Sequence, residues 1–205
     1  MEESAPLKTG HTMVIPLLLT AVITILTTII TLHPTTQAQS SPTIAHINGQ
    51  PITEAHFQTE LELQRVKYEL TQRNYPVNQA ALFNRIIGDT LILQAAAADG
   101  YQVEDTLVEN EINAILNRFG INRNEMTQIL RNHQLDWQVF ETSVREYTIL
   151  THYLDDVVLA NINYADRQNF LQNWMSDQYN NAKMDFDQTF LDRINAPIQI
   201  QGTNQ

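Results

Sequence analysis

Residues 44–62, IAHINGQPITEAHFQTELE, decide the fold of this chain. Residues 44–48 have the pattern of a short strand, and Asn48-Gly49 is a tight-turn signal, so a β-hairpin is expected. The hairpin runs into Thr53, a residue type suited to cap the start of a helix. Through residues 54–73, apolar side chains recur at helical spacing between charged ones, which predicts the first helix.

Five further helices follow, each with a start or stop signal at its ends. A short strand is predicted over residues 182–187, and the last dozen residues have the composition of a frayed tail. The sequence therefore predicts a mainly α fold of about six helices, with a short N-terminal β-hairpin and a C-terminal closing helix. The later helices are expected over residues 78–99, 105–119, a short stretch capped by Asn122 with Glu125, 136–157, and a stretch carrying Phe170 to Tyr179.

Residues 13–32, MVIPLLLTAVITILTTIITL, form a long uncharged apolar run. Twenty helical residues rise about 30 Å, which matches the hydrocarbon core of a bilayer. Lys8 precedes the run and the next basic residue is Arg65, so the positive-inside bias places residues 1–12 in the cytoplasm. We therefore expect a single-pass signal-anchor, with the rest of the chain at the extracytoplasmic face of the cell membrane.

A cleaved signal peptide is the alternative interpretation of the same segment. Thr36 and Ala38 supply small residues at the two positions that a signal peptidase recognises, although the apolar run is longer than usual for a signal peptide. Cleavage after Ala38 makes the protein secreted or periplasmic. Residues 33–43 are polar and contain two prolines, which is typical of a flexible linker. Both interpretations place residues 39–205 outside the cytoplasm.

Composition excludes several classes of function. The 205 residues include 12 Lys or Arg against 23 Asp or Glu, a formal net charge of -11, so nucleic acid is not expected as a partner. Without cysteine the chain forms no disulfide, thiolate nucleophile or cysteine zinc site. Six glycines leave little room for glycine-rich nucleotide loops.

No motif predicts catalysis, a metal or a cofactor. No two histidines are spaced i, i+3 or i, i+4, and such a pair is the usual beginning of a helical zinc site. Acidic pairs such as Glu104-Asp105 and Asp155-Asp156 are explained by helix starts and solvated faces. We expect solvent-exposed histidines, no metal, no cofactor and no enzyme activity. The histidines are at positions 11, 33, 46, 56, 133 and 152.

The opening stretch resembles the N-terminal domain of the SurA/PrsA-type envelope chaperones. That family has a short strand, an Asn-Gly turn and a charged helix, here carried by Ile47, Asn48, Gly49, Ile52, Thr53 and Phe57. Residues 82–115 and 129–154 are similar to the next two family signatures. The matching positions are Leu82, Ile86, Ile87, Leu91, Ala95, Gly100, Val103, Leu130, Leu135, Phe140, Arg145 and Leu150.

The resemblance implies a chaperone module over residues 44–160, followed by residues 161–205 with a helix, a short strand and a tail. Family members usually carry a glycine-rich parvulin prolyl-isomerase domain after the module. Only residues 161–163 separate the fifth and sixth helices here, so that domain is absent from this position. Residues 170–187 resemble the element with which relatives close the module.

The implied function is binding of unfolded or nascent exported polypeptides, without isomerase chemistry. The resemblance does not specify an oligomeric state. An adaptor for one membrane or envelope partner and a residual prolyl isomerase are the alternatives. Large side chains near helix ends are the candidate client contacts, although each is also a candidate core residue. They are Tyr75, Phe119, Met126, Trp137 and Trp174.

Overall fold

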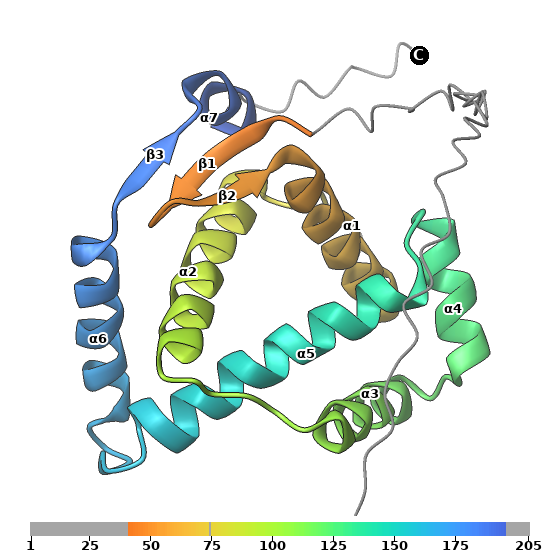
Figure 1. Ribbon diagram of the computed structural model, residues 1–205. Helices are drawn as coiled ribbons and strands as arrows, with labels where there is room; N and C mark the ends of the chain where they lie inside the picture. Colours follow the sequence, from red (N-terminus) through yellow and green to blue (C-terminus); the bar gives the residue numbers. More distant parts are fainter. Residues whose placement is uncertain (1–40, 74, 196–205) are drawn as a thin grey trace, which may run out of the picture. The chain divides into compact units, whose positions relative to one another are not determined.

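The computed structural model describes residues 41–73 and 75–195 (Figure 1). The predicted hairpin is present: β1 (Thr43–Ile47) and β2 (Gln50–Thr53) pair antiparallel around the Asn48-Gly49 turn. Both turn residues have left-handed backbones, with φ of 52° and 83°, which Asn and Gly adopt more readily than other residues. The predicted membrane segment, residues 13–32, lies outside the described residues.

The predicted helices are also present, and their caps are those expected from the sequence. Thr53 Oγ1 accepts a hydrogen bond from the backbone N–H of His56 (3.2 Å), and Asn122 and Glu125 form a reciprocal capping box. The helices are α1 (Glu54–Leu70), α2 (Gln79–Ala98), α3 (Asp105–Phe119), α4 (Arg123–Asn132), α5 (Trp137–Tyr153), the π-helical turn η1 (Leu154–Val158), α6 (Arg167–Asn181) and α7 (Gln188–Asn195).

Helices α1, α2 and α5 form the three sides of a triangle (Figure 1). Their buried apolar residues gather at its corners in three clusters instead of one central core. The sheet and α7 cover the α1–α2 corner, α3 and α4 cover the α1–α5 corner, and α6 covers the α2–α5 corner. Gly88 allows α6 to approach α2 closely, because a Cβ there would lie 3.2 Å from the Tyr179 hydroxyl.

The C-terminal elements return to the N-terminal hairpin. The predicted short strand is β3 (Met184–Phe186), which pairs antiparallel with β1, so the sheet order is β2-β1-β3. Helix α7 was not expected from the sequence. Its Phe190 is 3% exposed and packs edge to face on Phe57 and Phe83, with both pairs of ring centroids 5.0 Å apart. Residues 188–195 therefore belong to the core at the α1–α2 corner.

Asn48 joins three segments that are far apart in the sequence. Its backbone N–H donates to the Lys183 carbonyl (2.8 Å), and its Oδ1 accepts from the Lys183 N–H (2.9 Å). Its Nδ2 donates to Gln94 Oε1 (2.8 Å), and Gln94 Nε2 in turn donates to the Ile47 carbonyl (2.9 Å). One side chain in the hairpin turn thus fixes α2 and the start of β3 against β1.

Within residues 41–73 and 75–195, every helix is too short or too polar to cross a bilayer.

Replacing Asn48 tests this junction. Asn48→Gly keeps the left-handed turn but removes two side-chain hydrogen bonds, so the free energy of unfolding should fall by about 1–2 kcal/mol. Asn48→Ala also places an alanine in a left-handed backbone and should cost roughly 1 kcal/mol more. Urea unfolding followed by far-UV circular dichroism measures both. Equal midpoints for the wild type and both variants would contradict this role.

Phe190→Ala tests whether α7 is part of the core. Removing this buried ring should lower the free energy of unfolding by about 3–5 kcal/mol. Phe186→Ala is the matched control, because Phe186 is 36% exposed and should cost less than half as much. If α7 contributed nothing, Phe190→Ala would cost no more than Phe186→Ala.

Candidate functional site

A hollow of about 340 Å³ lies inside the triangle and is bounded by α1, α2, α3 and α5, with one residue from α4. We call it the central hollow. It is half open to solvent, and most of its wall is apolar. The hollow exists because the three hydrophobic clusters occupy the corners and leave the centre unfilled. Its apolar wall includes Leu63, Leu70, Leu93, Ile115, Phe119, Met126 and Tyr147.

Charged side chains of both signs surround this apolar wall. Three are basic and three are acidic, so the lining carries no net charge when all are ionised. This balance differs from the strongly acidic composition of the whole chain. Attraction of a ligand into the hollow therefore rests on apolar contact more than on net charge. The six residues are Lys67, Arg85, Arg118, Asp89, Glu111 and Glu146.

Two of these carboxyl groups titrate abnormally. Burial raises the pKa of Asp89 above its usual 3.8, although the Arg85 guanidinium opposes the rise and Glu60 adds to it. Burial likewise raises the pKa of Glu146 above 4.5, opposed by His56 and reinforced by Glu60 and Asp89. Asp89 of α2 and Glu146 of α5 are thus close enough to Glu60 of α1 to feel its negative charge, and the ionised forms of Asp89 and Glu146 are disfavoured in the folded protein.

The structure brings two of the five candidate client contacts together. Phe119, from the end of α3, and Met126, from α4, both line the central hollow. Phe119 is partly exposed, whereas Met126 is 1% exposed and belongs to the cluster at the α1–α5 corner. Tyr75 lies elsewhere, 54% exposed in a separate pocket beside the end of α1, where its ring meets Tyr68 at 5.2 Å.

The two tryptophans lie at helix junctions outside the hollow. Trp137 packs edge to face on Phe140 (5.3 Å), and the guanidinium of Arg123 lies 4.4 Å from its ring centre. It therefore occupies the junction of α4 and α5. Trp174 packs against the cluster at the α2–α5 corner and fastens α6 there. Both side chains are partly buried, in keeping with a structural role.

Tyr147 is an exposed aromatic residue of the hollow that was not among the candidate contacts. It is 56% exposed and lines the central hollow from α5. In the sequence it follows Phe140 and Val144 at helical spacing, and both of those are buried. The spacing therefore marks Tyr147 as a core residue. Its exposure results only from the triangular arrangement, which leaves this part of α5 uncovered.

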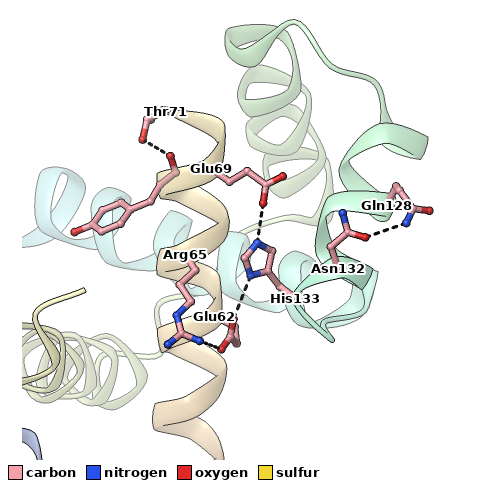
Figure 2. Close-up of polar contacts among 8 residues, drawn as sticks. Glu62, Arg65, Glu69, Thr71, Gln128, Asn132 and His133 are labelled. Carbon is pink, nitrogen blue, oxygen red and sulfur yellow. Dashed lines mark hydrogen bonds and ion pairs between the residues drawn. The ribbon is translucent and has the colours of Figure 1, made fainter. Parts of the chain in front are cut away.

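His133 also differs from expectation, because it is not a freely solvated histidine. Its side chain is 18% exposed and lies between Glu62 and Glu69 of α1, one carboxylate at each ring nitrogen (Figure 2). These carboxylates sit on opposite edges of the ring, so the three side chains do not converge on one point. Among the residues that the structure describes, no group of three or more His, Asp or Glu is arranged to hold a metal ion.

Glu146→Gln tests the cost of the charges around the hollow. The folded-state pKa of Glu146 is raised, so its stabilising contribution is complete below the ordinary value of 4.5 and is lost as pH rises through the folded pKa. The neutral variant should melt above the wild type at neutral pH, and the difference should vanish toward pH 4.5. Thermal unfolding at both pH values measures it. Glu141→Gln on the same helix is the control and should shift the melting temperature little. A destabilised Glu146→Gln protein at neutral pH would contradict the argument.

Comparison with known proteins supplies the family. No curated protein matches the chain. The model of the SurA-like N-terminal domain matches residues 7–154, which end within η1, so α6, β3 and α7 lie beyond the match. The match confirms the resemblance seen in the hairpin and the following helices, and the mainly α architecture agrees with it. A SurA N-terminal domain alone is not catalytic. The chain belongs to the chaperone-related family of SurA-like N-terminal domains.

Proposed function

We propose that this protein is a membrane-tethered, extracytoplasmic chaperone-like protein that binds unfolded or extended segments of exported proteins, without prolyl-isomerase chemistry. The observation that carries the proposal is the central hollow, an apolar and half-open space on a chaperone-related domain. Soluble proteins rarely leave such surface without a use.

The dimensions of the hollow suit a short segment. A volume of about 340 Å³ lies near the lower end of the roughly 300–1,000 Å³ found for small-molecule pockets. It therefore accepts a few side chains of an extended chain but not a folded domain. Phe119 and Tyr147 supply aromatic contact area, because both line the hollow and neither is fully buried.

The charges around the hollow favour weak and unselective binding. Because its lining carries equal numbers of acidic and basic groups, a client segment of either sign meets both attraction and repulsion. Residues 39–205 as a whole carry a net charge of -10, which keeps a protein with exposed apolar surface soluble and favours basic clients at long range.

The cellular location is part of the proposal and rests on the sequence alone. Residues 13–32 have the length and apolarity of a membrane anchor, and the charge distribution favours an N-terminus inside the cell. Such an anchor raises the effective concentration of the hollow near newly exported chains. Cleavage after Ala38 would leave the same chaperone function in a released protein.

An adaptor that binds one envelope partner is the second candidate. Exposed aromatic residues outside the hollow favour it, namely Phe170 and Tyr179 on α6 and Phe186 on β3, each 36–39% exposed. A single stoichiometric partner in a pull-down would favour the adaptor over a general chaperone. Acceleration of proline-limited refolding at substoichiometric protein would instead revive the isomerase alternative.

Aggregation suppression tests the chaperone proposal. The full chain in lipid nanodiscs is mixed with a chemically unfolded outer-envelope protein, and light scattering is followed over several ratios, with empty nanodiscs as the blank. We expect suppression near one-to-one. The double variant Phe119→Ser, Tyr147→Ser should need about thirtyfold more protein, since each side chain supplies roughly 1 kcal/mol of contact and about 2 kcal/mol corresponds to a factor of ~30.

Tyr164→Ser is the matched control. Tyr164 is 92% exposed and does not line the hollow, so its loss should leave suppression unchanged. Circular dichroism spectra confirm that each variant is folded. Absence of suppression at every ratio would refute the general chaperone function. Equal loss in the double variant and in Tyr164→Ser would refute the role of the hollow.

A further inference from the structure

Both ring nitrogens of His133 meet carboxylate oxygens. Nδ1 lies 3.1 Å from Glu62 Oε2, and Nε2 lies 2.8 Å from Glu69 Oε2 (Figure 2). A carboxylate oxygen only accepts hydrogen bonds, whereas a neutral imidazole has one N–H donor and one acceptor nitrogen. Only the doubly protonated imidazolium satisfies both contacts. While both glutamates are ionised, the geometry therefore favours a positive charge on His133.

The groups around His133 favour that charge. Burial alone lowers its pKa, but the hydrogen bonds from the ring to Glu69 and Glu62, together with their negative charges, outweigh burial and raise the pKa above 6.5. Arg65 binds the other oxygen of Glu62, and Arg73 lines the same pocket. Among the described residues, no charged group of α5 lies within ion-pair distance of the ring.

Helix α4 depends on few contacts for its position. It has ten residues, of which only Met126 and Leu130 are buried. Left-handed residues flank it on both sides, Gly120 with φ 65° and Gln134 with φ 59°. Three ion pairs hold it from outside. Arg123 pairs with Glu109 of α3 (2.7 Å), and His133, the residue that caps the end of α4, pairs with two glutamates of α1. Because Met126 lines the central hollow, any movement of α4 changes that wall.

We propose that His133 is a pH-sensitive latch, which holds α4 against α1 while its imidazole is doubly protonated and loosens α4 when the ring loses a proton. Deprotonation leaves one carboxylate without a donor and removes the attraction to both. The latch stabilises α4 fully below the ordinary histidine pKa of 6.5, and this stabilisation is lost as pH rises through the higher pKa of the folded state. The control of client binding rests on the proposed function, but the latch itself does not.

Trp137 provides the reporter, because Arg123 of α4 lies over its ring. Trp174→Phe leaves Trp137 as the only tryptophan of the chain. Fluorescence of this full-length protein in nanodiscs, titrated over about pH 5–9, should show a transition with a midpoint above 6.5. His133→Asn should abolish the transition. His152→Asn, which removes another histidine, should preserve it.

Glu69→Gln keeps the imidazole and serves as the second variant, which covers the case in which His133→Asn does not fold. It removes one negative charge and one ionic hydrogen bond, so the midpoint should move to lower pH. A transition that persists in His133→Asn, or a midpoint that does not move in Glu69→Gln, would overturn the latch. Hydrogen exchange, corrected for intrinsic rates, should show α4 amides losing protection across the same pH range while α3 amides keep theirs.

Aggregation suppression on either side of the midpoint separates the two proposals. Control of the hollow by the latch would be supported if the protein-to-client ratio needed for suppression differs above and below the midpoint, and if this difference is absent in His133→Asn. If the fluorescence transition appears but suppression is absent at every pH, the chaperone function fails and the latch stands. If suppression is present but identical on both sides of the midpoint, control of the hollow fails.

Discussion

The pairing of β3 with β1 is the constraint on which the rest of this structure depends. It places the last described elements of the chain against the first, so that α6 and α7 cover two corners of the helical triangle. Asn48 fixes the same junction to α2 through Gln94. Without this closure, Phe57 and Phe83 would lose Phe190, their shared aromatic neighbour. The N-terminal hairpin therefore also provides the strand, β1, with which the C-terminal strand β3 pairs.

The central hollow follows from how the apolar surface is distributed. Each of the three long helices contributes buried apolar residues to two of the three clusters, and smaller elements complete each cluster at a corner. The middle of the triangle receives side chains that suit neither a dry core nor open solvent. Asp89 and Glu146 there have raised pKa values, and Tyr147 remains exposed. Because this space is not filled by side chains, the fold gains less packing stability there and keeps an apolar surface exposed. Functional sites often combine reduced stability with an exposed surface in this way.

Local signals in the sequence predicted most of the fold. Thr53 and Asn122 cap the helices that they were expected to cap, and Gly120 has a left-handed backbone directly after α3. These signals succeed because a cap or a turn involves neighbours only a few residues apart. Helix α7 escaped prediction because it has eight residues, and its main stabilising contacts come from the distant rings of Phe57 and Phe83.

The candidate site shows the same difference between local signals, which the sequence carries, and contacts between distant elements, which it does not. Residue size and a position near a helix end selected Phe119 and Met126, which line the central hollow. Helical spacing made Tyr147 a core residue and gave no sign that His133 meets two glutamates. By itself the sequence determined the family, the hairpin and the helices other than α7 with their caps, since turns, caps and helical periodicity depend on near neighbours in the chain. Only the tertiary structure decided which helix faces stay uncovered and which charged side chains meet. The hollow and the His133 ion pairs form between different helices, and the distance between two helices in space does not follow from their separation along the chain.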